Sequence, residues 1–250
     1  MRRFAFLIAG LLLAAPLAAQ QVPDHIAAAV AAPERSAKDR ERDARDKPAE
    51  LLAFAGVEPG MKVADVFGGG GYWSEILARA VGPDGGVTLV NNAPYFNYAQ
   101  EDLKSRFGEG RLKDVRRRVV ETANMDLGRE QFDLILIYMS YHDIYWVEED
   151  AGWPEIDFDR FLVQLHDALK PGGKLLVVDH AAAAGSGSSA ASTLHRIDEA
   201  FTKNDFARHG FLFEKSWPGL RNSADDHTRN VFDEAIRGKT DRFTHLYRRG

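Results

Sequence analysis

Two pairs of histidine and aspartate stand where they could move a proton during a reaction. His142 and Asp143 follow the apolar run 132–138, and Asp179 and His180 close a second apolar run. Histidine titrates near neutral pH, which suits a general base. Because the carboxyl ends of parallel strands meet at one edge of a sheet, we expect both pairs to project into the same crevice. We therefore predict these four residues as catalytic, with His142 as the base.

The same four side chains allow other interpretations. Histidine and aspartate also cap helices and satisfy loop backbones, and this structural role stays open at this point. Imidazole and carboxylate groups also bind several divalent metals, which makes a metal site a lesser alternative. We predict no metal site from these residues.

A run of four glycines, Gly68 to Gly71, separates an apolar strand at 62–67 from a helix that carries Trp73. Glycines at such a junction let the backbone approach a ligand closely, and the helix that follows aims its N–H groups at the ligand. A dinucleotide-binding fingerprint would need a third glycine where the chain has Trp73 or Ser74. A nicotinamide-dependent oxidoreductase is therefore disfavoured.

The segments around these motifs alternate between strand and helix. Apolar runs predict strands at 62–67, 87–90, 115–120, 132–138 and 174–179, followed by a strand pair at 211–217 and 242–248. Apolar stripes followed by glycines predict helices at 157–169 and 194–209. The near-continuous run 132–138 is typical of a parallel sheet covered on both faces. This order predicts an α/β fold with a doubly wound sheet and a ligand crevice at the carboxyl ends of its strands.

The first 20 residues differ from the rest of the chain. Arg2 and Arg3 precede the apolar run 4–19, which ends in small residues, as in a secretory signal peptide. The run is short of the ~20 residues that span a bilayer, and no later segment is apolar enough to do so. We therefore expect residues 1–20 to be removed and the mature chain to be periplasmic or secreted, with no stable membrane span.

Residues 21–49 are predicted to form a charged helical lead-in, and residues 50–250 to form the main domain. Alternating charges from Ser36 to Lys47 suit an exposed helix whose charges pair with one another. A second helix is predicted from Pro48 to Ala55, before the turn at Pro59 and Gly60.

The composition of the chain excludes several functions. Its 250 residues include 37 acidic and 32 basic side chains, for a formal charge of −5, which argues against sequence-independent binding of nucleic acid. There is no cysteine, so disulfides, zinc–thiolate sites and a cysteine nucleophile are excluded. The composition carries no signal of the oligomeric state.

The segment from Asp65 to Gly71, an aspartate followed by glycines at two-residue spacing, resembles the first motif of the S-adenosylmethionine-dependent methyltransferases. The turn Lys170–Gly173 and the strand pattern Phe132–Leu136 are similar to later motifs of that family. More narrowly, the chain resembles a group of exported predicted methyltransferases in Gly69–Trp73, Tyr141–Asp143 and Val231–Asp233. The resemblance covers residues 48–248. It implies the Rossmann-like methyltransferase fold, a mostly parallel seven-stranded sheet with an antiparallel last strand.

The same resemblance implies S-adenosylmethionine as the cofactor and a small-molecule or exported methyl acceptor. Asp65, Gly69 and Gly71 would lie near the methionine part of the cofactor, Asn91 at its ribose and Asn124 near its adenine. Two positions depart from the family, because Phe67 replaces its first glycine and Asn91 replaces its acidic residue at the ribose. Asparagine can hydrogen-bond a hydroxyl group but lacks the charge that strengthens such bonds. A binding protein that keeps the fold without transfer activity is therefore the alternative.

Further polar and aromatic residues are candidates for contacts with the substrate. Polar candidates near the expected crevice are His195, Asp198, Asp226 and His227. An aromatic pocket could be formed by Tyr72, Trp73, Tyr141, Tyr145 and Trp146. For Trp73 we favour packing in the core beside the sheet.

Overall fold

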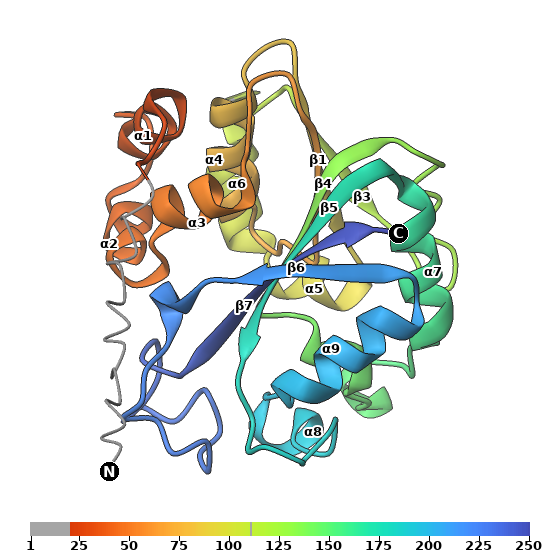
Figure 1. Cartoon of the computed structure of the whole chain (residues 1–250). Coiled ribbons are helices and arrows are strands. Elements are labelled where there is room, and N and C mark those ends of the chain that lie inside the picture. Colours follow the sequence, from red (N-terminus) through yellow and green to blue (C-terminus); the bar gives the residue numbers. More distant parts are fainter. Residues whose placement is uncertain (1–20, 111) are drawn as a thin grey trace, which may run out of the picture.

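The computed structural model describes residues 21–110 and 112–250, and in this part of the chain the strands form one seven-stranded sheet (Figure 1). Its strand order is β3-β2-β1-β4-β5-β7-β6. The strands are β1 (Lys62–Val66), β2 (Gly86–Asn91), β3 (Val115–Val119), β4 (Phe132–Tyr138), β5 (Leu169–His180), β6 (Phe211–Ser216) and β7 (Arg242–Arg249). Strands β1 to β5 pair in parallel, whereas β7 runs antiparallel to both β5 and β6. The predicted mostly parallel sheet with an antiparallel last strand is confirmed.

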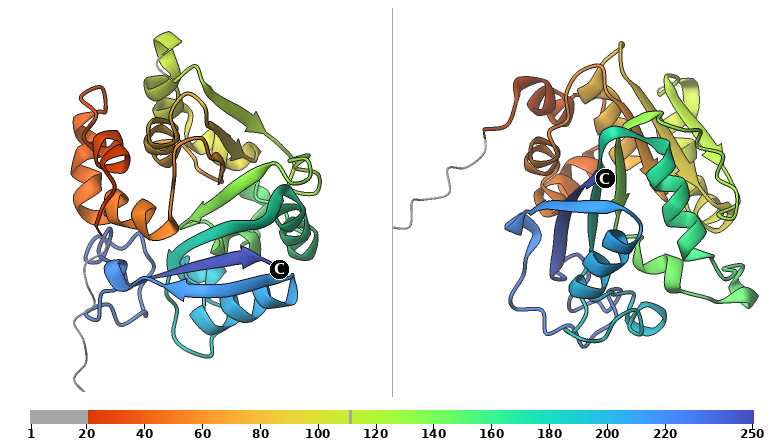
Figure 2. Two further views of the ribbon diagram at one scale, coloured as in Figure 1. Left: turned by 45° about the horizontal axis from the view of Figure 1, so that its top comes forward. Right: turned by 45° about the vertical axis from the view of Figure 1, so that its right-hand side comes forward.

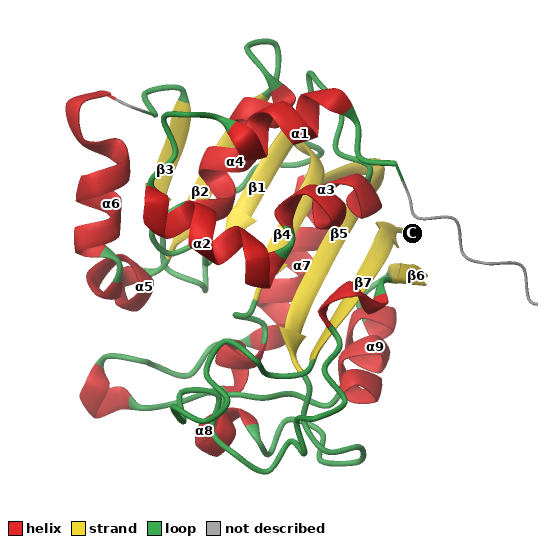
Figure 3. Cartoon of the chain, turned by 90° about the vertical axis from the view of Figure 1, so that its left-hand side faces the viewer, coloured by secondary structure: helices red, strands yellow, loops and turns green. Residues whose placement is uncertain are grey.

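Helices cover both faces of the sheet (Figures 1 and 3). The helices are α1 (Asp24–Ala31), α2 (Ala37–Asp46), α3 (Pro48–Ala55), α4 (Tyr72–Val81), α5 (Ala93–Tyr98), α6 (Gln100–Phe107), α7 (Phe158–Ala168), α8 (Ala191–Leu194) and α9 (Glu199–Arg208). Short 3₁₀ turns lie at Gly108–Gly110, His142–Tyr145, Glu149–Ala151 and Pro218–Leu220. Helices α1, α3 and α4 lie on one face of the sheet and α7 and α9 on the other (Figures 2 and 3).

The strands feed two separate apolar cores because successive side chains point to opposite faces of a sheet. Along β4, Leu134 and Leu136 are buried against α3 and α4, whereas Ile135 and Ile137 are buried against α7. This double burial explains why the strand reads as a continuous apolar run.

The predicted strand bounds differ from the observed ones by one residue at most, except for β5. The sequence predicted a turn at Lys170–Gly173 and a strand from Lys174, but β5 begins at Leu169. Leu169 pairs with Phe132 across a register shift, so the turn residues form an irregular start of the strand.

The predicted single helix at 194–209 is wrong. The structure has the short helix α8 and then α9, with His195 between them in the left-handed conformation at φ 53°. Asp198 caps the second helix, because its side chain accepts hydrogen bonds from the backbone N–H groups of Ala200 and Phe201. The apolar spacing continues across the break, so periodicity alone does not reveal it.

The expectation that α2 is an exposed helix is wrong for one of its faces. Asp39 is 4% exposed and Asp46 is fully buried. Asp39 forms an ion pair with Arg106 at 2.7 Å, and Asp46 forms one with Arg242 at 2.8 Å. These two carboxylates of α2 therefore attach it to the body of the fold and do not face water. The predicted domain boundary at residue 50 stays a prediction.

The predicted signal peptide at 1–20 lies outside the described residues. Within the described ranges, none of the helices has the length and apolar character needed to cross a bilayer.

Candidate functional site

The glycine loop after β1 begins at a strained residue. Phe67 has φ 54°, in the left-handed region that favours glycine. Its ring is buried and stacks on Tyr95 at 4.9 Å and on Phe161 at 5.4 Å between ring centroids. The side chain that replaces the family's first glycine therefore turns into the core beneath the loop.

The Asn91 side chain is hydrogen-bonded to the glycine loop. Its Oδ1 accepts a hydrogen bond from the Gly69 N–H at 2.9 Å, and its Nδ2 donates one to the Gly69 carbonyl at 2.9 Å. In this arrangement Asn91 fixes the conformation of the loop. The amide keeps a second N–H group and a second lone pair beside these bonds, and its predicted contact with a ribose stays a prediction.

The four glycines of the loop leave different amounts of space. A Cβ atom on Gly71 would lie 3.0 Å from the Phe107 ring, and one on Gly70 would lie 2.5 Å from Asp102 Cβ. A Cβ atom on Gly69 would meet only Tyr95, at 4.0 Å. Gly70 and Gly71 are thus needed for packing against α6, and Gly69 has the more open surface.

Asp65 lies beneath this loop and is fully buried. Its Oδ2 accepts a hydrogen bond from the Ser74 hydroxyl at 2.7 Å, whereas its Oδ1 is buried without a hydrogen-bond partner. Burial raises the pKa of Asp65 to about 6, although the hydrogen bond from Ser74 opposes this shift. A buried carboxylate oxygen without a partner is costly unless a ligand donates to it.

A cavity of about 290 Å³ lies over the loop, between it and α2. It is lined by Lys38, Asp39, Glu41, Arg42, Arg45, Gly68, Gly70, Tyr72, Asp102 and Arg106. Charges of both signs suit a ligand that carries both an ammonium and a carboxylate group, such as the amino-acid end of S-adenosylmethionine. The mixed charge of the cavity fits that end of the cofactor, although Asp65, Gly69 and Gly71 are not among its lining residues.

The predicted catalytic residues of the next two strands do lie together. His142 starts the 3₁₀ turn after β4, and Asp179 is near the end of β5. His142 Nδ1 lies 2.7 Å from Asp179 Oδ1, and His142 Nε2 lies 3.2 Å from Asp143 Oδ1. The side chains of His142, Asp143 and Asp179 are all buried. The parallel strand ends bring them together, as the sequence predicts.

Flanking carboxylates set the protonation of this cluster. Burial disfavours a charged imidazole, but Asp143 and Asp179 outweigh it and raise the pKa of His142 to about 10. Burial also opposes ionisation of Asp143, but His142 and His195 outweigh it and hold the pKa of that carboxyl well below its usual range. In this arrangement His142 is a hydrogen-bond donor at neutral pH, which does not favour its predicted role as a base.

His180 belongs to a different environment from its neighbours. Its Nδ1 lies 2.7 Å from the Thr240 hydroxyl, and its ring centroid is 6.0 Å from that of His142. Burial and the charge of His142 hold the pKa of His180 well below its ordinary value. His180 is therefore neutral and lies beside the cluster.

Two more side chains reach Asp143. His195 Nδ1 lies 3.6 Å from Asp143 Oδ1, and the Tyr95 hydroxyl donates a hydrogen bond to Asp143 Oδ2 at 2.5 Å. His195 was predicted only as a substrate contact, and Tyr95 was missed. Tyr95 occurs at the start of α5 in no recognisable motif, so only the fold reveals its position.

The remaining polar candidates support the backbone of the structure. Asp198 caps α9 and also accepts a hydrogen bond from the Gly185 N–H. Asp226 accepts a hydrogen bond from the Thr228 hydroxyl, and His227 Nε2 lies 3.2 Å from Asp241 Oδ2. Asn124 is exposed on the turn after β3, and its proposed place near an adenine stays a prediction.

The aromatic candidates do not form one pocket. Tyr72 donates a hydrogen bond to Asp43 at 2.5 Å and lies beneath the guanidinium of Arg42, so it holds α2. Trp73 is buried in the core, as predicted. Tyr141 and Tyr145 both donate to Asp205. Among the five, Trp146 contacts the cluster around Asp143, with its ring 5.1 Å from that of His195.

Comparisons with known proteins agree with this fold. No family model matches the chain. The ubiquinone/menaquinone biosynthesis C-methyltransferase UbiE of Shewanella pealeana is 31% identical over 129 residues, which are 51% of this chain and 46% of that protein. The UbiE protein of Bordetella avium is 29% identical over 132 residues, 51% of this chain and 44% of that protein. The matches thus span less than half the length of these relatives.

A solved structure extends the likeness over most of the chain. The crystal structure of a SAM-dependent methyltransferase from Aquifex aeolicus is 19% identical, with a TM-score of 0.54. The match covers 85% of this chain and 98% of that one. The chain therefore has the Rossmann-like fold of the S-adenosylmethionine-dependent methyltransferases.

Proposed function

We propose that this protein transfers a methyl group from S-adenosylmethionine to a small-molecule acceptor. The observation that carries this proposal is the glycine loop at the end of β1, with a cavity of mixed charge above it and an unpartnered carboxylate oxygen below it. The likeness to methyltransferases in sequence and fold supports it. The ligand crevice of such folds lies at the carboxyl ends of the strands, where this loop is found.

In this proposal the residues of the chain bind the cofactor and orient the acceptor. Asp65, Gly69 and Gly71 hold the methionine part of the cofactor, with Asn91 and Asn124 toward its ribose and adenine. The bound cofactor supplies a methyl group that its sulfonium already activates, so alignment of the acceptor is the main task of the protein. His142, Asp143 and Asp179 are the groups that hold a proton near the acceptor, with His180 beside them.

The acceptor remains to be identified, and the relatives offer a first class to assay. Their names place them in ubiquinone and menaquinone biosynthesis as C-methyltransferases. A quinone precursor with a reactive ring carbon is therefore the first acceptor to test.

An inactive protein that keeps the fold is the second candidate. It is favoured by Asn91, whose amide hydrogen-bonds both the N–H and the carbonyl of Gly69 and lacks the negative charge of the family's acidic residue. Such a protein would bind the cofactor or a relative of it without turnover.

Binding of S-adenosylhomocysteine tests the cofactor site directly. At 100 times its dissociation constant the ligand should stabilise the fold by about 2.7 kcal/mol, and NAD should not. Gly69→Ala should weaken binding at least tenfold in calorimetry. Gly60→Ala is the matched control, because Gly60 also has a positive φ and open space around it, but lies before β1. Equal affinity in the two variants would place the ligand elsewhere.

Activity of His142→Ala distinguishes the enzyme from the inactive protein. Loss of a group that assists proton transfer should lower the rate by about 10²- to 10⁴-fold. Binding of S-adenosylhomocysteine should stay close to that of the wild type. Full activity in a stably folded His142→Ala protein would remove His142 from the catalytic residues.

We also propose that the mature protein is exported, as the exported methyltransferases that it resembles are predicted to be. The support is the basic start and apolar run of residues 1–20. Mass spectrometry of protein from a native-like host should find a chain that starts near Gln20 or Gln21. Intact Met1 in the cytoplasmic fraction would contradict this proposal.

A further inference from the structure

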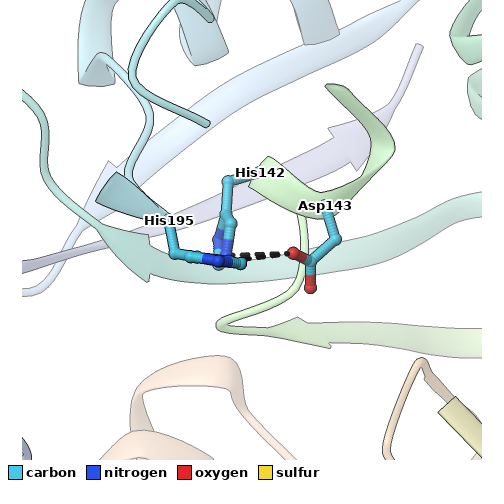
Figure 4. Close-up of side chains that lie close together, drawn as sticks. All are labelled: His142, Asp143 and His195. Atoms are coloured by element: carbon cyan, nitrogen blue, oxygen red, sulfur yellow. Dashed lines mark ion pairs between the residues drawn. The ribbon is translucent and has the colours of Figure 1, made fainter. Parts of the chain in front are cut away.

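Three side chains at the ends of β4 and α8 converge on one point (Figure 4). His142, Asp143 and His195 each offer one ligand atom, and these atoms all lie within 4.8 Å of one another. His142 Nε2 is 3.2 Å and His195 Nδ1 is 3.6 Å from the same carboxylate oxygen, Oδ1 of Asp143. In a tetrahedral zinc site with bonds of about 2.1 Å, neighbouring ligand atoms are about 3.4 Å apart. The two distances to Asp143 Oδ1 are close to this value.

Neighbouring groups orient two of these ligands. Asp179 accepts from the backbone N–H of His142 at 2.9 Å and lies 2.7 Å from Nδ1 of the same residue. This leaves Nε2 of His142 facing Asp143. A metal ion bound there would displace the Nε2 proton into solvent, since only the neutral imidazole is a ligand. A histidine that binds a metal through one nitrogen commonly gives its other N–H to a carboxylate in this way. Tyr95 holds Oδ2 of Asp143, which turns Oδ1 toward both imidazoles.

Apolar rings enclose the third ligand. The His195 ring lies 5.1 Å from Trp146 and 5.0 Å from Phe232 between centroids. An apolar wall lowers the local dielectric constant and strengthens bonds between a cation and its ligands. His195 itself is only partly buried, with 16% of its side chain exposed.

We propose that His142, Asp143 and His195 bind a divalent metal ion of the zinc type, with Asp179 as the positioning residue of His142. Two imidazoles and one carboxylate suit zinc and related transition metals better than magnesium or calcium. Three protein ligands leave one position open for water or for an oxygen atom of a substrate. The proposal does not depend on the proposed methyl transfer.

Metal binding to the untagged full chain tests this proposal. After removal of metal with a chelator, calorimetric titration with Zn²⁺ should give one ion per chain. His195→Gln should lower the affinity at least tenfold, and Asp179→Asn should lower it by about 10- to 100-fold without changing the stoichiometry. His166→Gln is the control, because His166 lies on α7 outside the cluster and should bind zinc like the wild type.

A second measurement, on the wild-type chain, tests the proposal even if the variants fail to fold. Co²⁺ added to the wild-type chain should give the intense visible absorption of a tetrahedral site, and Zn²⁺ should displace it. Circular dichroism should confirm that the variants are folded. Absence of stoichiometric Zn²⁺ binding to the wild-type chain, or unchanged affinity in a folded His195→Gln protein, would overturn the proposal.

Discussion

Asp65 couples folding to pH because its carboxyl group is fully buried and lacks a partner for one oxygen. Burial raises its pKa in the folded state to about 6, above the ordinary value of 3.8. The folded state therefore holds the proton more tightly than the unfolded state does. The stability that this proton provides is fully present below about pH 4 and is lost as the pH rises through 6.

Asp65→Asn should remove this dependence, because the amide stays neutral. The difference in unfolding free energy between the two proteins should change by about 2.5 kcal/mol between pH 4 and pH 7, with the wild type losing stability. Urea unfolding at a series of pH values measures it, and the contributions of other titrating groups cancel in the difference. A difference that does not vary with pH would show that Asp65 is not buried as described.

Among single residues, the positions that can be predicted from the sequence are those set by the order of the strands. His142, Asp143 and Asp179 meet because they follow neighbouring parallel strands, and that order can be read from apolar runs. Tyr95 and the inward face of α2 could not be found, because their contacts depend on how helices cross the glycine loop.

Among the elements, α2 is attached by buried ion pairs that a pattern of alternating charges does not distinguish from exposed ones. Asp46 accepts hydrogen bonds from Arg42 at 2.6 Å and from Arg242 at 2.8 Å. Burial opposes its ionisation, but Arg42 and Arg242 outweigh it and lower the pKa of Asp46 to about 2. By contrast, Lys38 and Asp102 pair on the surface, with side chains 79% and 54% exposed.

Asp46→Asn should destabilise the protein by about 3–5 kcal/mol, because it leaves Arg242 buried beside a neutral group. Lys38→Ala on the same helix should cost at most about 1 kcal/mol, because surface pairs contribute little. Chemical denaturation of both variants at neutral pH gives the comparison. Similar losses of stability in the two variants would mean that the buried face of α2 does not attach the helix to the rest of the fold.

The elements themselves were largely predictable. Strand bounds agree to within one residue apart from β5, and buried apolar runs mark strands such as β4 directly. The break between α8 and α9 was not predictable, since His195 adopts a left-handed conformation that side chains rarely take and no glycine marks the position. That break is also what aims His195 at Asp143.

At the scale of the whole molecule, the order of the strands places the two candidate regions along one edge of the sheet. The glycine loop follows β1, and the cluster of His142 follows β4, the next strand in the sheet. A ligand that spans the ends of β1 and β4 would contact both. Helix α2 lines the cavity over the glycine loop, so the helical lead-in contributes to the wall of this candidate site.

Removal of residues 21–47 tests whether the lead-in is part of the folded unit. Ile26 is fully buried in the same core as α3 and α4, and its loss alone should cost about 1.5–3 kcal/mol. Arg106 and Arg242 would also lose Asp39 and Asp46 as partners. We expect a total loss of stability above about 5 kcal/mol, a fall in Tm of at least about 10 °C, or failure to fold.

The reference for these measurements is the chain that starts at Gln21. Binding of S-adenosylhomocysteine should also be lost in the shortened chain, because α2 lines the cavity. A shortened chain that starts at Pro48 and both melts and binds like the reference would show that the lead-in is a separate appendage.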